Sequence, residues 1–380
     1  MGSAEQMWSG AKWQVPGWER PAVSSDLGRW SASASAKPVD SAPVVPADEP
    51  GELLSASATI EGLDRLLAAG VTRLRVPLDW ARLEPTNSRP DPVAAEHLVQ
   101  AIGLARSRGL AIWACLHDLD LPGWFAHDER GFSDERTRGY HWSRYVETVG
   151  ELVGDMVQGW IPVMEPTRWA KRGWLDGTTA PGSVGDTGGF MRNLQGIHAA
   201  SVQAALRLRE SGSPVASAQW SVPVFPARTA PNLPIAPQAE VAAARVHEVL
   251  WGSWVRMLDE EVLVLPDASP VEVPGARQAF DVIGITYRHA LSVGADGALD
   301  AYPRNVAVDG QGEAPWAEGL ALVLQRVAEE LPERDLMVGE VGLPDLGGDD
   351  RVAYLREVGS VLRDAAADAM PLVGAFHDIY

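Results

Sequence analysis

From Thr59 to the end of the chain, apolar runs of strand length alternate with amphipathic stretches of helix length. Apolar residues recur at helical spacing in residues 60–67, Gly70 then ends that helix, and residues 73–80 follow as a strand. The same alternation predicts further strands at residues 110–119, 159–166, 215–226, 280–289, 336–343 and 371–380. It predicts the other helices at residues 92–108, 142–157, 191–211, 238–259, 316–331 and 350–369.

The segment Lys12–Val15 supplies a first strand and brings the predicted number to eight. Eight strands separated by helices are typical of a closed barrel or of a doubly wound open sheet. An open sheet usually carries a Gly-rich phosphate-binding loop directly after its first strand, and this sequence has none there. We therefore predict an α/β fold of the (β/α)8 TIM-barrel type. Because the sequence stops on the eighth predicted strand, we expect this barrel to lack its last helix.

One segment interrupts the alternation. Residues 31–57 are rich in Ser, Ala and Pro and show no period, which is typical of a surface loop. The thirty residues before this segment are too few to form a core of their own. We therefore predict one barrel domain over residues 1–380, with a long loop at residues 31–57.

Charge and composition narrow the expected partners. The chain has 32 Lys and Arg against 51 Asp and Glu, a formal net charge of −19. A surface this acidic repels phosphate backbones and anionic lipids, so we expect neither nucleic acid nor a membrane as a partner. No apolar run is long enough to span a bilayer or to act as a signal peptide, and the single cysteine, Cys115, excludes a disulfide scaffold. These features predict a cytoplasmic protein, and they leave its oligomeric state open.

Two glutamates are the first candidates for chemistry. Reactive side chains of a (β/α)8 barrel gather where strands end, and Glu165 and Glu340 each follow an otherwise apolar strand. A carboxylate at such a position is costly unless it is paired or used, so a structural salt bridge is the alternative for either one. Two carboxylates at equivalent places favour the cleavage of an acetal. Arg75, at the end of the second strand, is a candidate to hold one of them ionised.

Other residue types in the loops allow more than one interpretation. The segment His117–Asp120 contains metal-ligand types, but neighbouring strand residues point to opposite faces and no second histidine follows at helical spacing. We therefore predict neither a metal ion nor a cofactor. Tryptophans in or beside predicted loops either fill the core or provide a stacking surface for a sugar ring. These are Trp142, Trp169, Trp174 and Trp316.

Six segments, in order along the chain, resemble the motifs of glycoside hydrolase family 1, the β-glucosidase family. The segments are Arg75–Pro85, Leu116–Phe125, Met164–Gly182, Val222–Ala227, Ile283–Arg288 and Gly339–Gly342. The first is similar to R-F-S-x-x-W-x-R-x-x-P, the second to H-H-F-T-x-P-x-W-F and the third to the N-E-P motif. The last two stand where the family has G-x-N-Y-Y and T-E-N-G. The resemblance covers residues from about 59 to 380.

The resemblance implies a (β/α)8 barrel and a retaining β-glycosidase that acts on a carbohydrate or other small glycoside. It implies that Glu165 is the acid/base, that Glu340 is the nucleophile and that Arg75 contacts the nucleophile. Gln14 matches the glutamine of the first strand that holds the sugar. Trp124 lies in the third-strand segment and is expected to line the substrate site.

Several positions that bind the sugar in the family carry a different residue in this sequence. Asp118 stands in place of a histidine, and Met164 in place of the asparagine before the acid/base. Thr286 replaces the asparagine of N-Y-Y, and Arg288 replaces the tyrosine that contacts the nucleophile. The C-terminal Trp-Glu-Trp segment of the family would lie beyond Tyr380.

Three hypotheses remain open from the sequence. The first is a retaining β-glycosidase for an atypical glycoside: a deoxy sugar that lacks a hydroxyl facing Met164, an amino sugar that suits Asp118, or a natural-product glycoside. The second is a pseudo-glycosidase barrel that binds a ligand or partner without hydrolysis. The third is a barrel recruited to another acid/base reaction.

Overall fold

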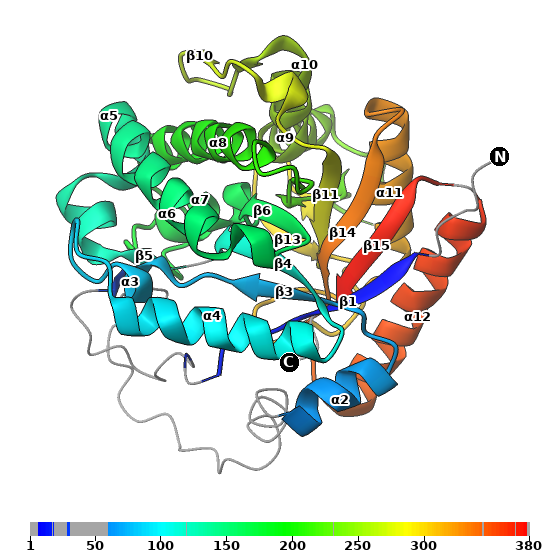
Figure 1. Cartoon of the computed structure of the whole chain (residues 1–380). Helices are drawn as coiled ribbons and strands as arrows, with labels where there is room; N and C mark the ends of the chain where they lie inside the picture. Colours follow the sequence, from blue (N-terminus) through cyan, green and yellow to red (C-terminus); the bar gives the residue numbers. More distant parts are fainter. Residues whose placement is uncertain are drawn as a thin grey trace, which may run out of the picture. The chain divides into compact units, whose positions relative to one another are not determined.

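The computed structural model describes residues 7–16, 18, 29–30, 60–118, 120–230, 232–343, 346–368 and 370–377 (Figure 1). The predicted loop at residues 31–57 lies outside these residues. The chain divides into two compact units. The N-terminal unit comprises residues 8–218, 278–281 and 380, and the C-terminal unit comprises residues 1–7, 219–277 and 282–379. No helix in the described ranges combines the length and apolar character that a membrane crossing requires.

The N-terminal unit alternates strands and helices as the sequence predicts. Its strands are β1 (Trp8–Lys12), β2 (Arg29–Trp30), β3 (Arg73–Pro77), β4 (Ala111–His117), β5 (Leu121–Pro122) and β6 (Gly159–Val163). Its α-helices are α2 (Ile60–Ala68), α3 (Trp80–Leu83), α4 (Pro92–Ser107), α5 (Glu135–Thr137), α6 (Ser143–Val153), α7 (Pro166–Trp174) and α8 (Thr187–Arg209). Short π or 3-10 turns lie at Trp124–Asp128, Gly131–Ser133, Arg138–Trp142 and Gly154–Met156.

Four of these strands form a parallel array in the order β1, β3, β4, β6. In its register Lys12 lies opposite Arg75, and Arg75 lies opposite Trp113. Every residue of β6 is buried, which is typical of a parallel strand covered on both faces. Helix α4 packs against β4 and α8 against β6 (Figure 1). This arrangement brings the carboxyl ends of the four strands to one edge.

Local sequence explains where the helices of this unit begin and end. Helix α4 begins after Asp91, whose carboxylate accepts from the Val93 N–H at 2.9 Å, and Pro92 occupies its first turn. Helix α2 ends before Gly70, which has φ +86°, a conformation that favours glycine. On α8, a Cβ at Gly196 would collide with the backbone carbonyl of Phe132, so the absence of a side chain permits this close approach.

The C-terminal unit contains a second parallel array. Its order is β7, β11, β14, β15. Its strands are β7 (Gln219–Trp220), β8 (Val224–Pro226), β9 (Val262–Leu263), β10 (Val271–Glu272), β11 (Val282–Tyr287), β12 (Ala290–Val293), β13 (Leu299–Tyr302), β14 (Asp335–Val341) and β15 (Leu372–His377). Its α-helices are α9 (Pro237–His247), α10 (Ser253–Glu260), α11 (Glu318–Glu330) and α12 (Gly348–Ala367). A π turn at Glu248–Gly252 joins α9 to α10, and a 3-10 turn spans Ala276–Gln278.

Two strand predictions need correction. The first strand is Trp8–Lys12, and only Lys12 of the predicted segment belongs to it. A turn closed by the Trp18 N–H and the Val15 carbonyl at 3.0 Å follows, because Pro16 cannot continue a ladder of hydrogen bonds. The predicted strand at residues 215–226 is also interrupted. Its last part, β8, leaves the parallel array and joins a side sheet with β12 and β13.

Candidate active site

Glu165 lies where β6 ends and α7 begins. Its backbone is left-handed, with φ 44° and ψ 53°, which costs a non-glycine residue on the order of 1 kcal/mol or more. Its N–H donates to the Ala218 carbonyl at 2.9 Å, and its carbonyl accepts from the Trp169 N–H at 2.8 Å. The residue is only 7% exposed. Backbone strain of this kind is concentrated at functional sites, so the turn itself marks Glu165 as a candidate.

Arg168 lies one helical turn after Glu165 on α7. Its Nη1 donates to Oε2 of Glu165 at 3.2 Å, and the two side chains are 8% and 9% exposed. Pro166 begins the helix in a position where its missing N–H costs nothing. The acid/base candidate is therefore part of a buried ion pair within one short helix.

Glu340 lies near the end of β14, at an irregularity in the sheet. Ile285 of β11 pairs with Val338, but the next residue, Thr286, pairs with Glu340, so β14 carries one extra residue between them. Such bulges redirect side chains and occur near active sites. Glu340 is 3% exposed, and Nη2 of Arg288 donates to its Oε1. The structure thus brings Glu340, Thr286 and Arg288 together at the ends of β11 and β14.

Arg75 belongs to a cluster of charges at the ends of β1, β3 and β4. It is fully buried, and its Nη1 lies 3.7 Å from Oδ1 of Asp118. The other carboxylate oxygen of Asp118 lies 2.9 Å from Nζ of Lys12. Two cations therefore compensate the negative charge of Asp118. The contact that the resemblance implies between Arg75 and the nucleophile stays a prediction.

Gln14 and Asp118 line the same small cavity. Its volume of about 30 Å³ is enough to admit water, and its remaining walls are Trp18, Pro77, Leu78, Asp79 and Asp120. The Gln14 side-chain amide donates to the Trp18 carbonyl at 2.5 Å, which orients it. The structure therefore brings Gln14 together with Asp118, although Gln14 lies two residues after the end of β1 and not within it.

The other two predicted substrate-binding residues differ in exposure. Met164 is 2% exposed and is fixed by its N–H, which donates to the His117 carbonyl at 2.8 Å. Trp124 is half-buried, and its indole N–H donates to the Glu84 carbonyl at 2.9 Å. Because that N–H is engaged, Trp124 has only its ring to offer a ligand.

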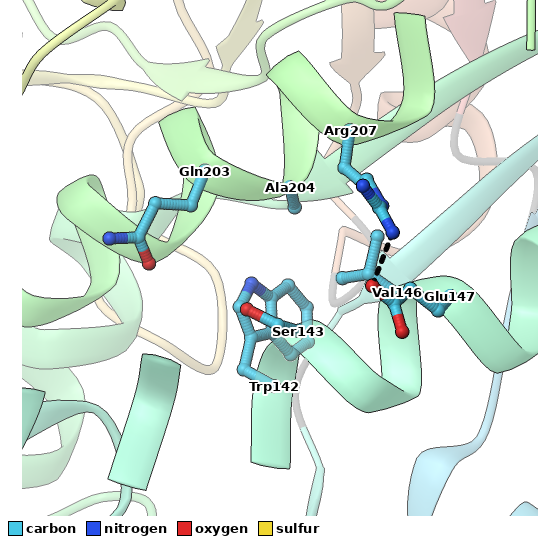
Figure 2. Close-up of a pocket in the computed structure, with 7 residues that line it drawn as sticks. All are labelled: Trp142, Ser143, Val146, Glu147, Gln203, Ala204 and Arg207. Atoms are coloured by element: carbon cyan, nitrogen blue, oxygen red, sulfur yellow. Dashed lines mark hydrogen bonds and ion pairs between the residues drawn. The ribbon is translucent and has the colours of Figure 1, made fainter. Parts of the chain in front are cut away.

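Trp142 fills the core. It is fully buried, and its indole N–H donates to the Ala200 carbonyl at 2.9 Å. It forms one wall of a cavity of about 160 Å³ on α6 and α8 (Figure 2). An ion pair between Arg207 and Glu147, 2.5 Å between Nη2 and Oε1, lines the same cavity.

Sequence reasoning missed three residues that the structure places beside the candidates. Arg168 could not be found from the predicted elements, because the sequence pattern predicts no helix at residues 166–174, and its contact with Glu165 depends on helix α7. Lys12 could not be found either, because its pairing with Asp118 depends on strand register. Glu313 pairs with His289, next to Arg288, at 3.2 Å, and its long loop carries no pattern that would place it there.

Metal-ligand residue types do not cluster within the part of the chain that the structure describes. No group of three or more His, Cys, Asp and Glu side chains there is placed to hold a metal ion. At the two strand ends the structure places carboxylates with arginines beside them.

Sequence comparisons match the chain to one family of known proteins. The family model described as glycosyl hydrolase family 1 matches residues 60–258. Beta-glucosidase 1B of Phanerodontia chrysosporium is 28% identical over 139 residues, which cover 36% of this chain and 25% of that protein. Human lactase/phlorizin hydrolase is 22% identical over 366 residues, which cover 83% of this chain and 18% of that protein. The chain thus spans a quarter or less of these two relatives.

Solved structures resemble the chain over most of its length. A beta-glucosidase from Thermotoga maritima in complex with glucoimidazole has a TM-score of 0.80 at 18% identity, covering 98% of this chain and 88% of that one. A beta-glucosidase from Exiguobacterium marinum has a TM-score of 0.77 at 18% identity, covering 99% and 90%. Their fold is the (β/α)8 barrel, so the predicted fold class is confirmed.

Proposed function

Because the chain belongs to glycosyl hydrolase family 1, we propose that it is a retaining β-glycosidase with Glu340 as nucleophile and Glu165 as acid/base. One observation carries the assignment. Each glutamate is buried at the carboxyl end of a parallel strand, at a backbone irregularity, and faces an arginine. Because each glutamate is paired, a structural salt bridge accounts for the burial of either one alone. Two such pairs at the ends of parallel strands, each at a backbone irregularity, favour a catalytic role.

The proposed reaction has two steps. The Glu340 carboxylate attacks the anomeric carbon and a glycosyl ester forms, while the bond to the aglycone oxygen breaks with its electron pair going to that oxygen, which takes a proton from Glu165 or from solvent. Water then attacks the same carbon while Glu165 takes its proton, and the ester bond breaks to restore Glu340. Arg288 would hold Glu340 as a carboxylate between turnovers, since an adjacent guanidinium favours the charged form. Arg75 would support the nucleophile from β3.

The proposed glycone carries fewer hydroxyl groups than glucose. Met164 cannot form a strong hydrogen bond, so a sugar hydroxyl buried against it would lose about 1–3 kcal/mol. Lys12 and Arg75 already compensate Asp118, so a cationic amino sugar gains less there than the sequence alone suggests. We therefore favour a deoxy glycone, held by Gln14 and Thr286, with the Trp124 ring as a stacking surface.

The test is a panel of 2,4-dinitrophenyl β-glycosides that includes gluco, 2-deoxy and 2-amino sugars. We expect turnover of at least one of them, fastest for the 2-deoxy sugar. Glu340→Gln should reduce kcat by about 10³-fold or more, because an amide cannot form the ester. Asp335→Asn is the control, since Asp335 is an exposed carboxylate at the other end of the same strand. Its activity should match the unmodified protein.

Two outcomes would reject the proposal, and each favours a different one of the remaining hypotheses. If no glycoside is turned over, the retaining-glycosidase assignment is rejected and a barrel that binds without hydrolysis takes its place. A Glu340→Gln protein with unchanged turnover would instead point to another nucleophile and to the third hypothesis, a recruited acid/base reaction.

A further inference from the structure

Resting on the proposed function, we propose that the substrate is a glycoside whose leaving group departs as a stable anion. Electron-poor phenols, enols and carboxylic acids are leaving groups of this class. The reason is the contact between Arg168 and Glu165, which makes Glu165 a general base and a poor general acid. Arg168 is then a positioning residue that selects the aglycone through Glu165.

The geometry fixes this contact firmly. Glu165 is the N-cap of α7 and Arg168 is the third residue of that helix, so the start of α7 brings the two side chains together. Nη1 and Oε2 are 3.2 Å apart, and both side chains are less than a tenth exposed. Water competes little for either charge at this depth, so the attraction is screened far less than at the surface.

The position of Glu165 in the helix acts in the same direction. Glu165 is the N-cap of the nine-residue helix α7, where the exposed N–H groups favour a negative charge. The first turn of α7 contains no acidic residue of its own. Lys171, one turn further on, is engaged with Asp176 at 2.7 Å. Helix and arginine therefore both stabilise the carboxylate form of Glu165.

A general acid must carry its proton before the glycosidic bond breaks. Protonation of Glu165 would remove one charge of a buried pair and with it the attraction between the carboxylate and the Arg168 guanidinium, which is costly. The bond from the anomeric carbon to the leaving oxygen must then break with its electron pair going to that oxygen. The aglycone leaves as an anion and takes its proton from solvent. Only an oxygen that bears negative charge well can leave in this way.

The second step is impaired less by Arg168. There Glu165 must accept a proton from water while water attacks the glycosyl ester, and a carboxylate is the form required. The proton then passes from Glu165 to solvent. Arg168 also makes this carboxylate a weaker base, but its main penalty falls on the first step, for substrates that need protonation. This difference between steps is what makes the inference measurable.

The first experiment is a leaving-group series on the glycone that the 2,4-dinitrophenyl panel identifies. General acid catalysis contributes about 10²–10⁴-fold, so we expect kcat/KM to fall by about that factor from the 2,4-dinitrophenyl to the phenyl glycoside. A series in which kcat/KM is nearly independent of the leaving group would overturn the inference and leave the proposed function intact. No turnover of any dinitrophenyl glycoside would reject the proposed function, and the inference with it.

The second experiment changes the arginine. Arg168→Met keeps an unbranched side chain of similar length without the charge, so the ratio of phenyl to dinitrophenyl kcat/KM should rise about 10-fold or more. Arg168→Lys retains a cation and should keep the low ratio of the unmodified protein. Lys171→Met is the matched control, because it removes a cation from the same helix that pairs elsewhere. An unchanged ratio in a folded Arg168→Met protein would overturn the inference. If that variant does not fold, the leaving-group series of the unmodified protein decides alone.

Discussion

A single buried thioether sets the expected glycone preference. Met164 precedes Glu165 in the chain and is 2% exposed, so whatever faces it loses contact with water. Met164→Asn would supply an amide donor where the related enzymes have one. Contacts to a sugar 2-hydroxyl contribute several kcal/mol in the transition state, so we expect kcat/KM for glucosides to rise about 10-fold or more over that for 2-deoxyglucosides.

Met164→Leu is the control for this substitution, since it changes shape slightly and adds no hydrogen-bonding group. Its ratio of gluco to 2-deoxy kcat/KM should stay as in the unmodified protein. The interpretation fails if the unmodified protein already hydrolyses glucosides faster than 2-deoxyglucosides. It also fails if both substitutions shift the ratio equally.

Candidate site residues could be predicted where the local sequence sets them apart. Glu165 and Glu340 stand out because each follows an apolar strand, and Arg288 because it replaces a tyrosine in a motif. The partners of these residues were harder to predict. Lys12 meets Asp118 only through the register of three strands, and register is not visible in residue order.

At the scale of elements, the close approach of α8 to the turn at residues 131–133 gives a stability prediction. A Cβ at Gly196 would overlap the Phe132 carbonyl, which is backbone and cannot rotate away. Gly196→Ala should therefore destabilise the protein by about 2–4 kcal/mol, as overpacking in a buried contact does. The free energy of unfolding in urea measures the effect.

Gly150 on α6 provides the opposite case. No atom lies within 4 Å of a Cβ at this position, and its backbone is helical. Gly150→Ala should raise the free energy of unfolding by about 0.5–1 kcal/mol, because alanine loses less conformational entropy in a helix. Equal effects of the two substitutions would contradict the packing that the structure shows between α8 and this turn.

Most elements could be predicted because hydrophobic periodicity follows burial. The predicted helix at 92–108 is Pro92–Ser107, and the predicted strand at 336–343 is Asp335–Val341. Periodicity fails where proline or a side sheet intervenes. Pro223 has no N–H for a ladder, so the chain leaves the array after Trp220, and β8 pairs with β12 instead.

At the scale of the whole molecule, the order of motifs along the chain predicted the barrel, because each motif marks the end of one strand. Overall composition could not predict how the chain responds to acid. Burial lowers the pKa of His198 to about 3 and lowers the pKa of His141, His247 and His377 below their ordinary value. The fold decides which of these rings are buried, so the number of histidines in the sequence does not predict their pKa values.

The resulting prediction concerns stability between pH 7 and pH 5. The pKa of His198 is about 3 in the folded state and about 6.5 in the unfolded chain. Between these two pH values the unfolded state binds a proton at this ring and the native state does not. Its contribution is complete above pH 6.5 and is lost progressively as the pH falls toward 3. From pH 7 to pH 5 this single ring should lower the free energy of unfolding by about 2 kcal/mol.

His198→Gln removes the titrating group while keeping a polar atom near Thr167, whose hydroxyl lies 3.5 Å from Nε2 of His198. The variant should therefore lose about 2 kcal/mol less than the unmodified protein when urea unfolding is measured at pH 7 and again at pH 5. His127→Gln is the control, because His127 is exposed and should leave the pH dependence unchanged. The prediction is wrong if His198→Gln and the unmodified protein lose the same free energy of unfolding between pH 7 and pH 5. His198 would then take up its proton in the folded state, and burial would not keep its ring neutral.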